Sequence, residues 1–136
     1  MRQDQLNYLN NTILKKAKGL RYLVKDLAPQ NENELFNSSG LIIWSGSSDN
    51  TIYQDKSVNW AFRALHDALH LKTGLGFSPK HEIEMGKIQA SKESSSFLAE
   101  IIFCEVAEQA AYFEKTGLFV ADQVEFTLNY LKQKGF

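Results

Sequence analysis

The segment VNWAFRALHDALHL, residues 58–71, decides how the rest of this chain is interpreted. Its apolar side chains are numerous enough to be buried on most sides of a helix. Polar side chains recur among them at spacings of four, three and four residues, which places them within an arc of roughly 60° on that helix. These are Asn59, Arg63, His66 and His70, with Asp67 beside the arc. Buried charge is costly unless it is paired or bound to a ligand, so we expect the stripe to meet polar partners.

A second helical stretch, residues 97–114, repeats the pattern. Its apolar content also indicates burial on most sides, while one narrow face is polar. That face carries Glu105, Glu108, Gln109 and Tyr112. Two such helices can pack with their polar stripes facing each other, which predicts a pocket between the His66 helix and the Glu105 helix. The alternative is that both stripes face water, as one side of any amphipathic helix does.

His66 and His70 have the spacing of a two-histidine metal half-site, because imidazoles at positions i and i+4 point the same way from a helix. Glu105 is a candidate third ligand, which would leave an open position for water or substrate on a divalent metal such as zinc. The sequence HDALH is a variant of the zinc-protease pattern H-E-x-x-H, in which Asp67 is one methylene shorter than the usual glutamate base.

The same residues allow two metal-free interpretations. In the first, they form a pocket in which some side chains act as acid and base groups and others bind a small ligand. The catalytic candidates are His66, Asp67, His70 and Glu105. The ligand-binding candidates are Asn59, Arg63 as an anion anchor, Glu108, Gln109 and Tyr112. In the second interpretation, the cluster is a fixed hydrogen-bond network that orients two helices, and it has no ligand.

The whole chain predicts a mainly α single domain, residues 1–136, with about five helices and one small β-hairpin. Residues 40–54 predict the hairpin, because two runs of strand formers, LIIW and TIY, flank a polar loop. Residues 57–136 predict the helical part that carries the polar site. Residues 5–27 predict an amphipathic helix, because apolar side chains recur at alternating steps of three and four. They are Leu6, Leu9, Ile13, Ala17, Leu20, Val24 and Leu27.

The composition indicates a soluble globular protein, since 43% of the 136 residues are hydrophobic and 23% are charged. It excludes intrinsic disorder, a collagen-like repeat and a disulfide scaffold. The net charge of -1 argues against a nucleic-acid binder that works by bulk electrostatics. Cys104 is the single cysteine, and with no secretory signal in view this favours a cytoplasmic protein. The strongest apolar run is too short and too charged to span a membrane.

Several ordered blocks give the chain a resemblance to a protein family. They are Asn59-Trp60-Ala61-Phe62-Arg63-Ala64-Leu65-His66-Asp67 with His70, then Gly76-Phe77-Ser78, then Glu105-Val106 with Gln109 and Tyr112-Phe113, then Asp122-Gln123 with Phe126. In these blocks the chain resembles a family of small, uncharacterised proteins encoded by bacteriophages and prophages. The resemblance implies a helical site built from these polar residues and a place in the cytoplasm of a bacterial host. It implies no particular reaction.

Two classes of function follow from the residues and the resemblance. The first is a small hydrolase or ligand-binding protein, with its pocket between the His66 and Glu105 helices. The second is a phage accessory protein that binds a host protein, for example an inhibitor of a host defence system, in which the polar stripes are structural. Clustered histidines and carboxylates favour the first, whereas small size and the lack of a complete catalytic signature favour the second.

Overall fold

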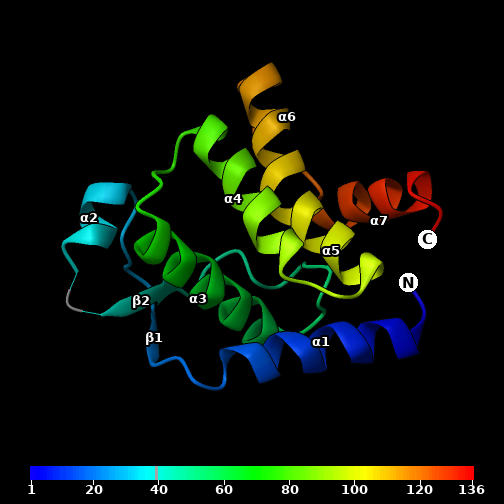
Figure 1. The fold of residues 1–136 in the computed structure, drawn as a ribbon, viewed down its shortest axis with the longest axis horizontal. Coiled ribbons are helices and arrows are strands. Elements are labelled where there is room, and N and C mark those ends of the chain that lie inside the picture. The colour runs from blue at the N-terminus through cyan, green and yellow to red at the C-terminus, as the bar shows by residue number, and fades with distance from the viewer. Residues whose placement is uncertain (39) are drawn as a thin grey trace. The chain divides into compact units, whose positions relative to one another are not determined.

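The computed structural model describes residues 1–38 and 40–136, and it is mainly helical with one small sheet, as the sequence predicts (Figure 1). The chain divides into two compact units, Met1–Gly74 and Leu75–Phe136. A single domain over residues 1–136 would require the two units to pack together as one body. That part of the sequence analysis stays a prediction. In the described part of the chain, every helix falls short of the length and apolar character that crossing a bilayer requires.

Unit 1, Met1–Gly74, is built on two long helices that pack together, α1 (Gln3–Ala17) and α3 (Lys56–Thr73) (Figure 1). Between them the chain forms β1 (Tyr22–Lys25), the short helix α2 (Glu32–Phe36) and β2 (Leu41–Trp44), and β2 contacts α3. Apolar side chains from α1, α3 and the intervening segment make the core of this unit. They include Leu6, Leu9, Ile13, Leu35, Ile43, Val58, Ala61 and Phe62.

The predicted helix over residues 5–27 is wrong beyond Ala17, where α1 ends. Apolar spacing typical of a helix continues into the next residues, but Gly19 interrupts it and a helical glycine costs roughly 1 kcal/mol. The chain then forms strand β1, in which half-buried and exposed residues alternate with a period of two. Leu27, the last member of the predicted stripe, is 81% exposed. Pairing with another strand therefore overrides a helical pattern that the sequence continues for ten residues.

The small sheet is present, but the predicted hairpin is wrong. Strand β2 pairs with β1 in parallel, with Tyr22 opposite Leu41 and Lys25 opposite Trp44. Parallel strands need a crossover, and the segment containing α2 supplies it. The second predicted strand, residues 51–53, instead forms a buried turn in which the Gln54 amide donates to the Thr51 carbonyl at 3.1 Å. This turn directly precedes the start of α3.

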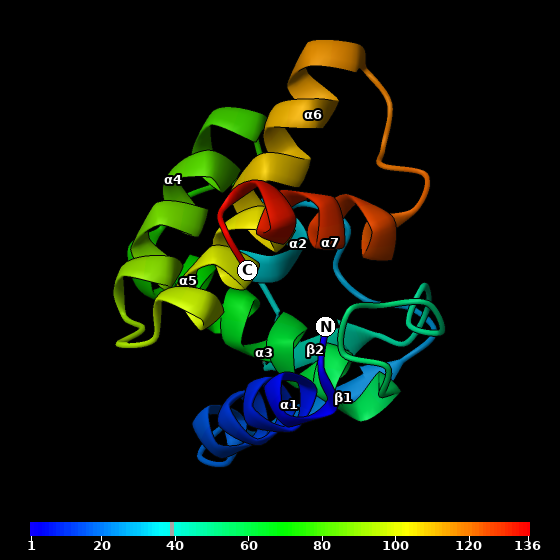
Figure 2. The same cartoon turned by 90° about the vertical axis from the view of Figure 1, so that its right-hand side faces the viewer.

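Unit 2, Leu75–Phe136, consists of helices (Figure 2). They are α4 (Pro79–Ser91), α5 (Ser96–Phe103), the π-helical turn η1 (Cys104–Glu108), α6 (Gln109–Thr116) and α7 (Gln123–Gln133). The predicted helix over residues 97–114 is therefore present, and η1 interrupts its α-helical hydrogen bonding. Ser78 caps α4 in front of Pro79, while Gly74 and Gly117 end α3 and α6 in the left-handed conformation.

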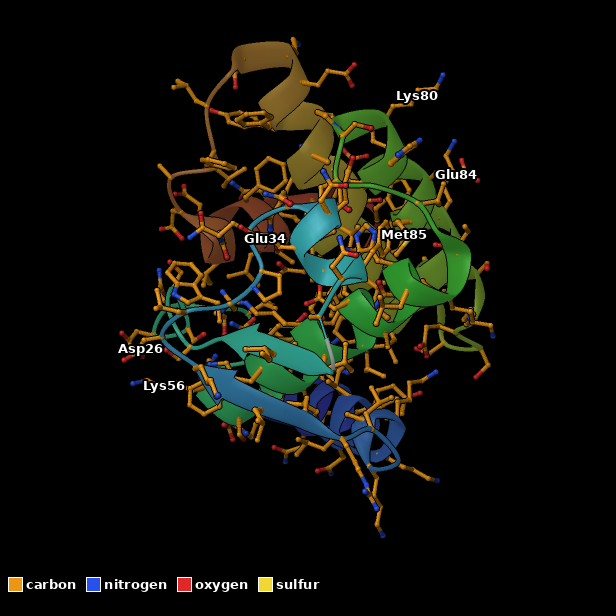
Figure 3. All side chains as sticks on the ribbon, turned by 90° about the vertical axis from the view of Figure 1, so that its left-hand side faces the viewer. Asp26, Glu34, Lys56, Lys80, Glu84 and Met85 are labelled. Carbon is orange, nitrogen blue, oxygen red and sulfur yellow. The ribbon has the colours of Figure 1, made fainter. Side chains whose placement is uncertain are left out.

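Helix α4 packs very closely on η1, and Gly86 makes this approach possible. A Cβ atom at residue 86 would lie 2.6 Å from Cβ of Ala107 and 2.9 Å from its backbone nitrogen. On the same helix Met85 is fully buried, while Lys80 and Glu84 point outward into solvent (Figure 3). The inner face of α4 thus combines one large side chain with one residue that has no side chain at all.

Truncating the buried side of α1 should destabilise the protein strongly. Leu9 is 0% exposed, so Leu9→Ala should lower the free energy of unfolding by about 2–5 kcal/mol through lost burial and a new cavity. Leu27→Ala removes the same atoms from an exposed position and should change stability by less than about 0.5 kcal/mol. Urea unfolding of the two variants checks this, and equal losses would show that α1 does not pack as described.

Adding a methyl group at residue 86 should separate α4 from η1. Gly86→Ala should cost roughly 1–3 kcal/mol, because the contact is with backbone as well as with a side chain. The cost should be smaller in an Ala107→Gly background, which a double-mutant cycle measures. Gly19→Ala is the control, since a Cβ atom there meets nothing within 4 Å. Additive effects of the two substitutions at positions 86 and 107 would contradict the close approach.

Candidate functional site

His66 and His70 lie one helical turn apart on α3, and their rings meet. The two Nε2 atoms are 3.1 Å apart, and the ring planes are nearly perpendicular, at 88°. His70 is buried at 1% exposure, whereas His66 is half-buried and its ring lies parallel to that of Phe62. The helix that positions them begins at Asp55, whose carboxylate accepts a hydrogen bond from the Ser57 amide at 2.8 Å. The predicted convergence of these two imidazoles is therefore present.

A separation of 3.1 Å between two imidazole nitrogens fits two arrangements. If both rings are neutral, one Nε2–H can donate a hydrogen bond to the other Nε2. If both Nε2 atoms are unprotonated, their lone pairs converge on a point that a metal ion can occupy.

The other two members of the α3 stripe hold a loop. Arg63 donates from Nη1 to the carbonyl oxygens of Trp44 and Gly46, both at 2.6 Å, and from Nη2 to that of Ser47 at 3.3 Å. The Nδ2 group of Asn59 donates to the Ser48 hydroxyl at 2.9 Å. These bonds fasten the segment after β2 to one face of α3, so a structural role accounts for Asn59.

Arg63 keeps a half-buried positive charge in this position. Burial lowers the pKa of its guanidinium, and the nearby Asp67 carboxylate partly opposes that effect. The guanidinium lies 5.5 Å from the centre of the Trp44 ring, which adds a cation–π contact. Arg63, His66 and Asp67 also form one wall of a pocket of about 220 Å³ within unit 1. Three of the predicted site residues are thus brought to a single cavity.

In unit 2 the predicted site residue Glu105 lies in the π-helical turn and accepts two hydrogen bonds. The Gln109 side-chain amide donates to Oε2 at 2.9 Å, and the Thr127 hydroxyl donates to Oε1 at 3.1 Å. Burial raises the pKa of Glu105 to about 7, although these two hydrogen bonds oppose the shift. A carboxyl group with this pKa exchanges its proton near neutral pH, which is what a general acid or base requires. π-Helical turns occur frequently at functional sites.

The sequence interpretation missed two polar residues of α7: Thr127, which is a partner of Glu105, and Tyr130, which is a partner of Glu100. Thr127 is 0% exposed, and the Cys104 thiol donates to its hydroxyl at 3.7 Å, so the chain of bonds runs from thiol to hydroxyl to carboxylate. The Tyr130 hydroxyl donates to the Glu100 carboxylate at 2.5 Å. A polar residue on the apolar side of an amphipathic helix was the available signal for Thr127. Cys104 is 0% exposed, and burial raises the pKa of its thiol to about 12, which makes it a poor nucleophile.

The remaining members of the second stripe are less enclosed. Tyr112 is 37% exposed and its ring meets that of Phe126 edge to face, while Glu108 is half-buried. Of this stripe, the structure brings together Glu105 and Gln109. The predicted meeting of the two stripes joins residues of different units, and it stays a prediction.

Comparison of the chain with protein-family models, with curated proteins and with solved structures gave no match.

The raised pKa of Glu105 should make the protein less stable as the pH rises. Between its ordinary value of 4.5 and about 7, the folded state binds a proton that the unfolded state has lost, so the free energy of unfolding falls across this range. Glu105→Gln cannot ionise and should remove that part of the decline. Urea unfolding at several pH values from 4.5 to 8 measures the difference between wild type and variant.

Glu84→Gln is the control for this experiment, because Glu84 is exposed on the outer face of α4 (Figure 3). It should leave the pH profile as in wild type. The difference between the wild-type and Glu105→Gln profiles isolates the contribution of the carboxyl group. A Glu105→Gln profile parallel to that of wild type would show that folding does not raise the pKa of Glu105.

Proposed function

We propose that this protein binds a divalent metal ion such as zinc through Nε2 of His66 and Nε2 of His70. The distance of 3.1 Å between these atoms is the observation that carries the proposal. Two imidazoles that bind one tetrahedral zinc ion at 2.0–2.1 Å have their nitrogens about 3.3 Å apart. The pair therefore has nearly the spacing of two ligands of one ion, and helical i, i+4 geometry holds it there.

The chemistry that such a centre offers is that of a small hydrolase or ligand-binding protein. A metal ion with an open coordination position lowers the pKa of a bound water and can present it as a nucleophile near neutral pH. The pocket in unit 1 supports this function, because His66 lies on its wall together with Arg63 and Asp67. In this proposal Arg63 anchors an anionic group of the ligand, and the protein works in a bacterial host during phage or prophage growth.

Two histidines leave room for a carboxylate as third ligand. The sequence predicts Glu105 for this role, although its oxygens already accept hydrogen bonds from Gln109 and Thr127. Glu105 belongs to the other unit, so its role as third ligand stays a prediction, which Glu105→Gln tests.

A second candidate function, binding to a host protein, is favoured by a different observation. Unit 1 exposes large apolar side chains on and next to its sheet: Leu23 is 59% exposed, Leu27 81% and Trp44 48%. Exposed apolar groups close together are typical of interaction surfaces. This function predicts that Leu23→Ser impairs the effect of the protein on its host while His66→Ala does not, and the metal proposal predicts the reverse.

Zinc should stabilise the protein by mass action, and a chelator should remove that stabilisation. Binding to the folded state alone raises the free energy of unfolding by RT ln(1 + [L]/Kd), so the melting temperature rises with the logarithm of the zinc concentration once that concentration exceeds Kd. The shift should be larger at pH 7.5 than at pH 5.5, because a ligand imidazole must be unprotonated. Thermal melting with zinc and with chelator, together with elemental analysis of the purified protein, provides the measurement.

His66→Ala and His70→Ala should each abolish the difference between the zinc and chelator melting curves. His81→Ala is the matched control: its imidazole is exposed, and its Nδ1 accepts a hydrogen bond from the Gly76 amide at 3.0 Å. It should retain the full difference. Absence of both a chelator effect and bound metal in wild type would assign the histidine pair to a hydrogen bond and overturn the proposal.

A further inference from the structure

The pocket beside His66 has two chemically different sides. Pro29, Ile42 and Phe62 contribute apolar walls, while Arg63, His66 and Asp67 contribute polar groups from α3. Its volume of about 220 Å³ is below the roughly 300–1,000 Å³ of pockets for drug-sized ligands. At roughly 30 Å³ for each water molecule in the liquid, it has room for a small organic molecule.

Arg63 uses only part of its hydrogen-bonding capacity to hold the loop after β2. A guanidinium group has five N–H donors. Nη1 donates twice, to the Trp44 and Gly46 carbonyls, and Nη2 donates once, to the Ser47 carbonyl. Within the described residues, Nε–H and the second Nη2–H make no hydrogen bond. Both hydrogens of Nη1 and one of Nη2 are engaged, so the two remaining donors belong to the nitrogens of the Nε–Nη2 edge and are left for another acceptor.

That edge is a fork of two parallel donors, the geometry that binds a carboxylate or phosphate through two oxygens at once. The loop carbonyls hold the fork in place, so little side-chain entropy is lost when an anion binds. The net charge of the polar pocket wall determines whether a carboxylate or a phosphate is the better ligand. Asp67 on the same wall offsets the charge of Arg63, which disfavours a doubly charged phosphate and leaves a single negative charge as the better match.

We propose that the Nε–Nη2 edge of Arg63 binds the carboxylate of a small ligand whose flat apolar body lies against Pro29, Ile42 and Phe62. The inference rests on the proposed function for its chemistry, because His66 belongs to both the metal pair and the pocket wall. It names the class of ligand for that site, a monocarboxylate. The carboxylate subsite itself consists of unit 1 residues and needs no metal to form.

Benzoate is a suitable probe, because it joins one carboxylate to one flat apolar ring. We expect the Nε–Hε resonance of Arg63 to shift on titration of the wild-type protein with benzoate, with a Kd on the order of 1 mM for so small a ligand. Benzamide has the same shape without the charge and should cause no shift. Asp67→Asn should tighten benzoate binding, because it removes a like charge from the wall.

Arg63→Lys should weaken benzoate binding at least tenfold, since lysine keeps the charge but loses the fork. Trp60→Phe is the matched control for the loop. It removes the hydrogen bond from Trp60 to the Ser45 carbonyl at 3.2 Å, which fastens the same segment to α3, and should leave benzoate affinity within about twofold. Equal weakening in both variants would assign Arg63 to the loop and overturn the proposal.

The titration is done on chelator-treated protein and again with zinc, which separates this inference from the proposed function. A shift of the Arg63 resonance without zinc supports the carboxylate subsite even if no metal binds. Zinc binding without a benzoate-induced shift overturns the subsite and leaves the metal proposal standing. Tighter binding of inorganic phosphate than of benzoate would overturn the assignment to monocarboxylates.

Discussion

The hydrogen bonds from Arg63 to the carbonyl oxygens of Trp44 and Gly46 are the interaction on which the candidate site depends. They turn the chain back at the end of β2 and fix it to α3, one helical turn before His66. Trp44 then packs its ring over Gly46, where a Cβ atom would collide with the indole. Desolvating a guanidinium group is costly, and carbonyl oxygens at short distance offset that cost without neutralising the charge. The same bonds that stabilise the loop therefore keep a positive charge beside a pocket.

The sequence was sufficient to predict the features that depend on local patterns. The helical register of Asn59, Arg63, His66 and His70 follows from spacing alone. Spacing also predicted that the two imidazoles would meet. These features involve residues within one or two helical turns of each other. Over that range the helical period of 3.6 residues determines which side chains are neighbours.

Features that depend on distant partners were not predictable in this way. Residues 22–25 continue an apolar helical pattern, and only pairing with residues 41–44 makes them a strand. The partners of Glu105 include Thr127, which is remote in sequence and belongs to a helix that the polar stripes did not involve. The π-helical turn has no known local signature either. It coincides with the close approach of α4 at Gly86, a packing constraint between helices rather than a property of one segment.

The parallel sheet of unit 1 has a consequence for the behaviour of the protein at high concentration. A sheet of two strands leaves one edge of each strand unpaired, and an unpaired edge can template the addition of another chain. Leu23 would favour such growth, because it is exposed in the middle of β1. Arg21 and Lys25 flank it, and both are exposed. Two copies that aligned these edges side by side in register would bring like charges together, so the basic residues around β1 act as a barrier to fibrillar self-assembly.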